Sequence, residues 1–182
     1  VFSACTGSKE KKAFSSGQSG CQGASQGKTD SPGGASDGAG KDKKSLVVYF
    51  SWSGNTERVA ESIQSQTGAD IFEIIPAEPY SDDYDTVVEV AREEQRKNAR
   101  PVISGSIENI EQYDVIYVGF PNWWGDMPMI LYTFFDSYDL SGKTVALFCT
   151  SGGSGLSGTV NEVKNLEPGA EVTSGLHIGS GS

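Results

Sequence analysis

The chain has 182 residues and a formal net charge of −10, which is unevenly distributed. Seven lysines and four acidic residues give residues 1–44 a charge of +3, whereas seven basic and twenty acidic residues give the remainder −13. An acidic domain repels nucleic acids and anionic membranes, which excludes nucleic acid as a partner. It favours basic partner proteins, although simple solubility explains the charge equally well.

Cysteine and histidine are too few to build a disulfide framework, a metal cluster or a catalytic triad. The cysteines are Cys5, Cys21 and Cys149, an odd number at wide spacing, and His177 is the single histidine of the chain. Cys149 lies in an apolar run, which is typical of a buried thiol. A lone histidine in a strand is more often structural than functional, so we expect a structural role for His177.

Residues 1–44 are predicted to be a disordered tether, because they contain nine glycines and eight serines without apolar periodicity. The segment Phe2-Ser3-Ala4-Cys5 resembles the end of a bacterial lipoprotein signal. We favour lipid attachment at Cys5 and a membrane-anchored, extracytoplasmic bacterial protein over an ordinary cysteine in a cytoplasmic one. Since the apolar stretch of such a signal is absent, we expect the sequence to be truncated before Val1.

The globular part, residues 45–182, begins with alternating strands and helices. Residues 45–51 form a nearly continuous apolar run, which predicts a parallel strand buried on both faces. Apolar residues at helical spacing predict a helix over 56–66, which ends before Gly68. Residues 71–75 predict the second strand.

A longer helix follows and ends before Pro101. Its apolar face is Tyr84, Val87, Val88 and Ala91, at positions i, i+3, i+4 and i+7. Residues 115–120 predict the third strand, and Pro128 begins the next helix.

The last predicted elements are a fourth strand over 144–149, a short helix over 159–166 and a fifth strand over 172–178, which Gly175 weakens. This alternation indicates an α/β domain with three layers, in which helices cover both faces of a doubly wound, five-stranded parallel sheet. Ligands of such sheets bind at the carboxyl ends of the strands. The site is therefore expected in three loops, residues 51–56, 121–128 and 150–158.

The first of these loops runs from a strand directly into a helix, and its residues are Ser51, Trp52, Ser53, Gly54, Asn55 and Thr56. Hydroxyl groups, an amide and the free N–H groups of a helix start favour a phosphate. The loop has no lysine and no G-x-G-x-x-G pattern, which excludes a Walker loop and a dinucleotide fingerprint. The alternative is an ordinary capped helix start.

The second loop places Trp123 and Trp124 side by side in a polar stretch. Exposing two tryptophans is unfavourable unless something flat, such as an isoalloxazine ring, covers them. The alternative is packing against a neighbouring helix, which is expected for one of the two. The third loop, residues 150–155, supplies backbone donors and acceptors for the edge of a ring, or is a plain Gly-Ser linker.

Together, Ser51-Trp52-Ser53-Gly54-Asn55-Thr56-Glu57 and Pro121-Asn122-Trp123-Trp124-Gly125 resemble the flavodoxin family, in particular a short-chain bacterial subgroup. The resemblance spans residues 45 to about 179. It implies a sheet of order 2-1-3-4-5 and a non-covalent flavin mononucleotide (FMN).

By resemblance, the first loop would bind the phosphate of FMN. The flavin ring would be flanked by Pro121, Asn122, Trp123, Trp124 and Gly125, and its far edge would meet Thr150, Ser151, Gly152, Gly153, Ser154 and Gly155.

Two departures from the family pattern affect these expectations. The third loop lacks the tyrosine that often stacks on the flavin, so stacking is expected from Trp123 or Trp124. The sequence stops at Ser182, where the family has a last helix, so we expect a truncated sequence with one sheet face partly bare.

The leading functional prediction is an FMN-binding electron-transfer protein, because no side chain resembles a general acid or base for a substrate. One alternative is an NAD(P)H-dependent oxidoreductase that reduces a quinone or another acceptor. Another is a surface lipoprotein that uses the fold as a non-enzymatic binding module. No metal is expected, and membrane contact is expected only through Cys5.

Overall fold

The computed structural model describes residues 43–179. Cys5, Cys21 and most of the predicted tether lie outside these residues. Within residues 43–179, no helix is long and apolar enough to cross a membrane.

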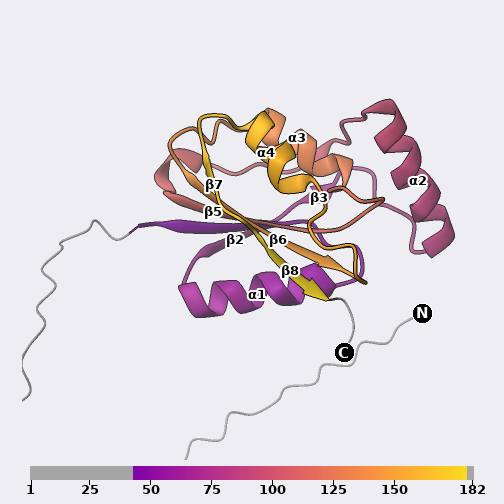
Figure 1. Cartoon of the computed structure of the whole chain (residues 1–182), viewed down its shortest axis with the longest axis horizontal. Coiled ribbons are helices and arrows are strands. Elements are labelled where there is room, and N and C mark those ends of the chain that lie inside the picture. The colour runs from indigo at the N-terminus through magenta and orange to yellow at the C-terminus, as the bar shows by residue number, and fades with distance from the viewer. Residues whose placement is uncertain (1–42, 180–182) are drawn as a thin grey trace, which may run out of the picture. The chain divides into compact units, whose positions relative to one another are not determined.

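A parallel sheet forms the middle layer of the domain (Figure 1). Its strands are β1 (Ser45–Tyr49), β2 (Asp70–Glu73), β5 (Val115–Pro121), β6 (Thr144–Ser151), β7 (Glu171–Val172) and β8 (Leu176–Gly179). The order is β2-β1-β5-β6, and both β7 and β8 pair with β6. Because β5 covers one edge of β6, the two short strands share the other. Counted as one interrupted strand, they complete the predicted order 2-1-3-4-5, which is confirmed.

The predicted continuous strand over 172–178 is wrong, because the chain breaks between β7 and β8. Gly175 has φ 71°, a left-handed conformation that extended backbone does not adopt. A Cβ atom at Gly175 would lie 2.9 Å from Leu156 and 3.3 Å from the Leu147 carbonyl oxygen. The glycine thus allows the chain to bend closely past these residues and to return to β6 as β8.

Three helices form the outer layers of the domain. In Figure 1, α1 (Asn55–Thr67) covers one face of the sheet, while α3 (Met129–Ser137) and α4 (Thr159–Leu166) cover the other. The bounds of α1 and α4 agree with the predicted ranges to within one residue. These helices and the sheet confirm the predicted three-layer, doubly wound architecture.

The remaining helix, α2 (Tyr84–Lys97), stands at the end of the sheet toward which the strands point (Figure 1). It begins at Asp83, whose carboxylate accepts a hydrogen bond of 2.9 Å from the Thr86 amide. Its last residue is Lys97, because Asn98 adopts a left-handed conformation with φ 49° and ends the helix, in agreement with the predicted end before Pro101.

A second, two-stranded antiparallel sheet was not predicted. It pairs β3 (Ile75–Pro76) with β4 (Ile103–Ser104), and a single turn of 3₁₀ helix, η1 (Ile110–Gln112), precedes β5. The predicted strand over 71–75 is therefore too long, because β2 ends at Glu73. Two-residue strands carry no periodicity, so the apolar pattern could not separate β3 from β2.

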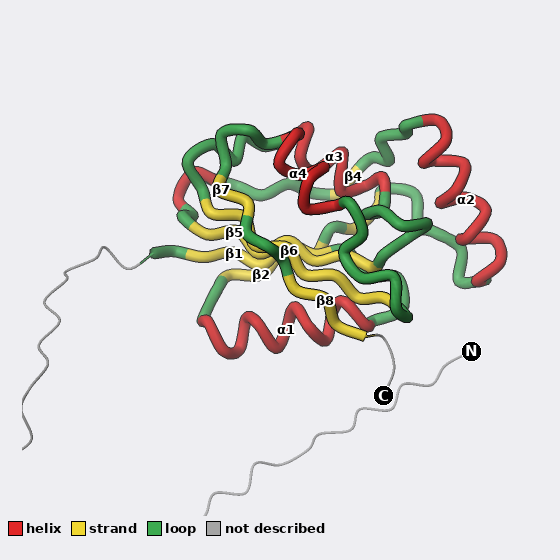
Figure 2. The backbone as a smooth tube through the Cα atoms, viewed as in Figure 1, coloured by secondary structure: helices red, strands yellow, loops and turns green. Residues whose placement is uncertain are grey.

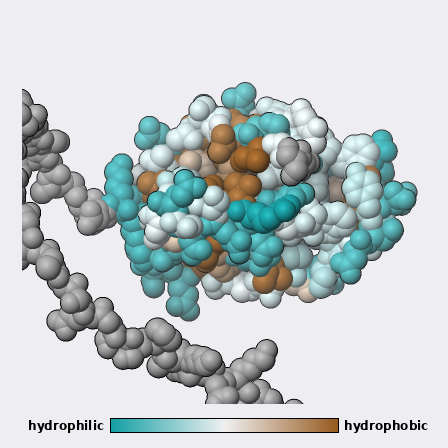
Figure 3. All heavy atoms as spheres, turned by 90° about the horizontal axis from the view of Figure 1, so that it is seen from below, coloured by the Kyte–Doolittle hydropathy of each residue, from teal (hydrophilic) through white to brown (hydrophobic). Residues whose placement is uncertain are grey.

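The core is thicker on the α3 and α4 side of the sheet than on the α1 side. A cluster that includes the fully buried Phe120, Phe134 and Met127 fills the first side. The α1 side holds a smaller cluster of five buried residues, namely Val47, Tyr49, Ala60, Ala69 and Phe148. Beside α1, a hollow of about 330 Å³ is lined by residues that include Tyr117, Phe148 and Leu176. Figure 3 shows apolar side chains reaching the surface on this side.

Candidate cofactor-binding site

The loops that follow β1, β5 and β6 lie together at one end of the sheet, beside α2 (Figure 2). Between them is a pocket of about 440 Å³. The predicted residues that line it are Trp52, Ser53, Asn55, Pro121, Asn122, Trp123, Trp124, Thr150, Ser151 and Gly152. Four residues of α2 complete the wall, namely Tyr84, Val87, Val88 and Ala91.

The first loop leaves the N-terminus of α1 open. Gly54 precedes the helix with φ 78°, and within the described residues no side chain caps the helix. The side-chain amide nitrogen of Asn55 donates to Ser53 Oγ at 3.1 Å, and its side-chain oxygen accepts from the Arg58 guanidinium. The alternative of an ordinary capped helix start is thus not what the structure shows. The first N–H groups of a helix have no intrahelical acceptor and carry partial positive charge, so they favour an anion.

Ser51 carries an orphaned polar atom at the end of β1. Its Oγ is the one buried side-chain oxygen or nitrogen in the described residues without a hydrogen-bond partner. An unsatisfied buried hydroxyl costs about 1–3 kcal/mol, so such groups mark places where a ligand or water completes the structure. Its position beside an open helix N-terminus fits a bound phosphate oxygen.

A side-chain hydrogen bond joins the first loop to the third. Thr56 Oγ1 lies 2.9 Å from Thr150 Oγ1, and both residues are buried. Thr56 belongs to the first turn of α1 and Thr150 to the end of β6. This contact fixes the helix start against the sheet.

The second loop is a tight hairpin held by backbone hydrogen bonds. The Trp123 amide donates to the Asp126 carbonyl at 2.8 Å, and the Asp126 amide donates back at 3.1 Å. The two residues between them, Trp124 and Gly125, have φ 54° and 81°. Left-handed backbone is natural for Gly125 but strained for the bulky Trp124.

Asn122 holds the second and third loops together. Its amide nitrogen donates to the Gly155 carbonyl at 3.0 Å, and its oxygen accepts from the Gly125 amide at 3.0 Å. Both glycines have positive φ, so their chains could adopt other paths in isolation. The asparagine selects one conformation for each loop.

The two adjacent tryptophans have different surroundings. Trp123 is half-buried and packs edge-to-face against Phe50 and Tyr80, with ring centroids 5.4 and 5.3 Å away. Trp124 is 50% exposed, and its indole N–H donates to the Val88 carbonyl of α2 at 3.0 Å. The Arg92 guanidinium lies 5.0 Å from the centre of the Trp124 ring. Trp123 therefore packs against the core, although its aromatic partners do not belong to a helix. Trp124 is the tryptophan that contacts a neighbouring helix, as was expected for one of the two, and it stays at the pocket rim.

Comparison with known proteins identifies the family to which the chain belongs. A sequence model described as "Flavodoxin" matches residues 44–181, most of the chain. The chain belongs to the flavodoxin family.

Known flavodoxins and related structures agree with this assignment. Flavodoxin 1 of Escherichia coli K12 is 27% identical over 106 residues, which cover 56% of this chain and 46% of that protein. The chain therefore spans about half the length of this curated relative.

Two solved structures extend over most of the domain. A candidate flavoprotein from Bacteroides eggerthii is 35% identical, with a TM-score of 0.69 over 76% of this chain and 89% of that chain. A flavoprotein from Lactobacillus acidophilus, solved in complex with FMN, is 28% identical, with a TM-score of 0.66 over 74% of this chain and 92% of its own. The family and the FMN complex of this neighbour support FMN as the cofactor that the sequence predicts.

Some predicted residues of this flavodoxin site do not line the pocket. They are Ser51, Gly54, Thr56, Gly125, Gly153, Ser154 and Gly155. Thr56 is buried and its hydroxyl contacts Thr150, while the Ser51 hydroxyl is buried without a partner at the end of β1.

Sequence reasoning missed the contribution of α2 to the flavodoxin pocket. Its apolar spacing was correctly identified, but only Val87 and Ala91 are fully buried, and Tyr84 is 67% exposed. Tyr84 lies 6.1 Å from the ring centre of Trp52, whose indole N–H donates to the Ser81 carbonyl at 2.9 Å. Helix α2 thus adds an aromatic side chain to the pocket beside Trp52 of the first loop.

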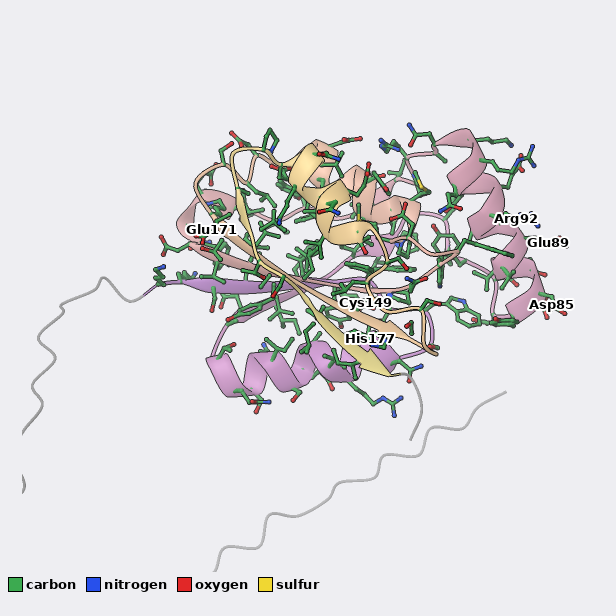
Figure 4. All side chains as sticks on the ribbon, in the orientation of Figure 1. Asp85, Glu89, Arg92, Cys149, Glu171 and His177 are labelled. Atoms are coloured by element: carbon green, nitrogen blue, oxygen red, sulfur yellow. The ribbon has the colours of Figure 1, made fainter. Side chains whose placement is uncertain are left out.

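The charged and nucleophilic groups near the pocket limit its chemistry. Burial raises the pKa of the Cys149 thiol to about 12, so it stays protonated at neutral pH. The prediction of a buried thiol is confirmed. Within residues 43–179, no cluster of histidine, cysteine and acidic side chains could hold a metal ion. In Figure 4, Asp85 and Glu89 point outward from α2, whereas the Arg92 guanidinium lies over the Trp124 ring.

Proposed function

We propose that this flavodoxin-family chain binds FMN in the pocket and acts as a one-electron carrier. The single observation that carries the proposal is the buried, unpartnered hydroxyl of Ser51 beside the open N-terminus of α1. The hydroxyl and the N–H groups of the helix start can donate hydrogen bonds to an anionic oxygen. The Ser51 hydroxyl has no other partner in the described residues. The related Lactobacillus acidophilus flavoprotein was solved in complex with FMN, which supports the same ligand here.

The phosphate would be held by neutral donors at the first loop. The Ser51 hydroxyl and the amides at the start of α1 would donate to its oxygens, and Ser53 and Asn55 line the same end of the pocket. Arg58 lies in the first turn of α1 and donates to Asn55, so a cation lies close to this end of the pocket. Its charge supports an anion at this end.

The flavin ring would lie against the exposed aromatic side chains. Trp123 is engaged edgewise by Phe50 and Tyr80, whereas Trp124 and Tyr84 present half or more of their surface to solvent. We therefore assign the stacking wall to Trp124, with Tyr84 on the α2 side. Ser151 and Gly152 also line the pocket, and their backbone would supply the donors and acceptors that polar ring atoms need.

FMN supplies the redox chemistry, and the protein supplies binding, orientation and the surrounding charge. The negative charge of the domain disfavours a reduced, anionic flavin and thereby lowers its reduction potential. It also attracts basic partner proteins, which we propose as the redox partners. A substrate-transforming oxidoreductase is less well supported, because the described residues around the pocket place no histidine, lysine or free thiol at its lining.

Attachment at Cys5 remains our proposal for the location of the protein. A lipid on this cysteine would tether the domain to a membrane through residues 6–44. Mass spectrometry of the protein from bacterial membranes tests it directly, because a lipidated Cys5 adds the mass of its acyl chains to the N-terminal peptide.

The FMN proposal is tested by titrating the apoprotein with FMN and with riboflavin, which lacks the phosphate. We expect Ser51→Ala to weaken FMN binding about ten-fold and to leave riboflavin binding unchanged, because the hydroxyl meets only the phosphate. Ser62→Ala, on the exposed face of α1, is the matched control. Equal affinity of the wild type for FMN and riboflavin would overturn the phosphate assignment.

The carrier role is tested by mixing the FMN-loaded protein with NADPH alone. A carrier keeps its oxidised visible spectrum until a reductase is added. Rapid bleaching by NADPH without another protein would instead support the oxidoreductase alternative. Failure of the wild type to bind any flavin would support a non-enzymatic binding module.

A further inference from the structure

The Ser151 hydroxyl is the centre of a small hydrogen-bond network at the end of β6. Its Oγ accepts from the Gly155 amide at 3.0 Å and from the Gly153 amide at 3.3 Å. It also lies 2.9 Å from Nε2 of His177, which comes from β8. Figure 4 labels His177 on β8, next to Cys149 of β6. One side chain therefore contacts both ends of the glycine loop and the neighbouring strand.

The number of donors at this oxygen determines the direction of the His177 contact. A serine hydroxyl has two acceptor sites and one proton to donate. The two glycine amides occupy both acceptor sites, so the hydroxyl proton must go to Nε2 of His177. The histidine thus acts as the acceptor, with its ring proton on Nδ1.

The strand register places His177 for this role. In the pairing of β6 with β8, His177 is opposite Cys149, and Gly179 is opposite Ser151. The partner position of Ser151 therefore has no side chain to compete for its hydroxyl. Residues 149 and 151 share a face of β6, so the imidazole reaches Ser151 diagonally along the same face.

The loop needs such a restraint because its backbone is unusual. Gly153 and Gly155 have φ 147° and 64°, conformations that only glycine adopts readily. A glycine-rich loop loses much conformational entropy when it becomes ordered. The hydrogen bonds from both amides to the Ser151 hydroxyl offset this loss of entropy. Ser151 and Gly152 of the ordered loop line the pocket.

We propose that His177 is a positioning residue for the flavin, acting through Ser151. By accepting a hydrogen bond from the Ser151 hydroxyl, His177 fixes that hydroxyl in the rotamer that binds the Gly153 and Gly155 amides. The loop is then ordered before the ligand arrives, and the ring edge binds without an ordering penalty. His177 does not line the pocket itself. This inference rests on the proposed binding of FMN.

The test compares substitutions of His177 that differ in hydrogen-bond capacity. His177→Ala removes the acceptor, and we expect about five-fold weaker FMN binding. His177→Gln keeps an acceptor oxygen at a similar reach and should restore the wild-type affinity. His177→Lys offers only donors and should bind FMN as weakly as the alanine variant. Leu176→Ala, an exposed neighbour on β8, is the matched control and should bind as the wild type does.

A double variant shows whether His177 acts through the hydroxyl. In a Ser151→Ala background, His177→Ala should have no further effect on FMN binding, because the connecting hydroxyl is already lost. Additive losses of affinity would overturn the proposal. An affinity of His177→Ala within two-fold of the wild type would also overturn it.

Amide hydrogen exchange of the apoprotein gives a readout that needs no flavin. We expect His177→Ala to accelerate exchange at Gly153 and Gly155 several-fold, while the amides of β5 keep their wild-type rates. Unchanged exchange at both glycines would overturn the inference. Failure of the wild type to bind FMN, with accelerated exchange in the variant, would refute the proposed function but support the role of His177 in ordering the loop.

Discussion

The two ends of the pocket are built in different ways. The proposed phosphate end comes from six consecutive residues that follow β1 and include the first turn of α1, and its key features are an open helix start and one free hydroxyl. The proposed ring end is assembled from α2 and two separate loops, joined by side-chain hydrogen bonds from Asn122 and Trp124. A local, polar subsite is thus combined with a non-local, aromatic one, and substitutions should affect the two ends separately.

Trp123→Ala should have the largest effect on stability, because it removes the side chain that packs the second loop against the core. The ring packs against Phe50 and Tyr80, so its loss leaves a cavity and should lower the free energy of unfolding by about 3 kcal/mol. Chemical denaturation of the apoprotein, followed by circular dichroism, measures this value. A loss below about 1 kcal/mol would mean that the ring end does not depend on this cluster.

Gly54→Ala and Gly68→Ala form a matched pair for the phosphate end. Both glycines flank α1 in left-handed conformations, with φ 78° and 68°. Each alanine variant should therefore lose about 1 kcal/mol of unfolding free energy. Only Gly54→Ala should also weaken FMN binding, about ten-fold, because Gly54 shapes the loop around the phosphate. Equal FMN affinities of the two variants, measured by calorimetric titration, would contradict this separation.

Trp124→Gly and Trp124→Ala should separate backbone strain from ligand contact at the rim. Both variants remove the indole and should bind FMN about five-fold more weakly. Glycine tolerates the left-handed backbone of this position, so the glycine variant should be about 1 kcal/mol more stable than the alanine variant. The same denaturation and titration experiments apply, and a more stable alanine variant would show that the turn is not strained.

Glu94→Gln should have the smallest effect on stability, and the size of that effect should depend on pH. Burial raises the pKa of Glu94, whose carboxylate accepts from the Tyr80 hydroxyl at 2.9 Å. A raised pKa in the folded state means that stability falls as pH rises through it. Glutamine keeps the acceptor without a charge, so the variant should have the higher melting temperature at pH 8, with the difference shrinking toward pH 4. A difference that grows toward acid pH would refute this account.

The sequence was sufficient for the parts of the fold that depend on local pattern. Continuous apolar runs located β1, β5 and β6, and helical spacing located α1 and α4 nearly to the residue. A phosphate loop could be proposed from residues 51–56 because its hydroxyls, amide and helix start are adjacent in the sequence, and its ligand stays a prediction. The order of the strands came from the family resemblance, and the structure confirms it.

The remaining features depend on contacts that no local pattern encodes. The spacing of Val87 and Ala91 predicted a buried face on α2, but not that this face borders a pocket at the end of the sheet. The difference between Trp123 and Trp124 results from Tyr80 and Val88, which lie far away in the sequence. Likewise, the hydrogen bond from Ser151 to His177 crosses 26 positions of the chain. His177 was expected to be structural, and its link to a pocket residue became evident only in three dimensions.

Because of where the tryptophans lie, the intrinsic fluorescence of the domain should report on ligand binding. The chain contains three tryptophans, and Trp52, Trp123 and Trp124 all line the same pocket. Indole emission from the chain therefore originates entirely at the candidate site. A bound chromophore that absorbs in the near ultraviolet and blue, as a flavin does, would accept this excitation energy over a few ångströms. The intrinsic fluorescence of the unlabelled protein should thus fall in proportion to the occupancy of the site.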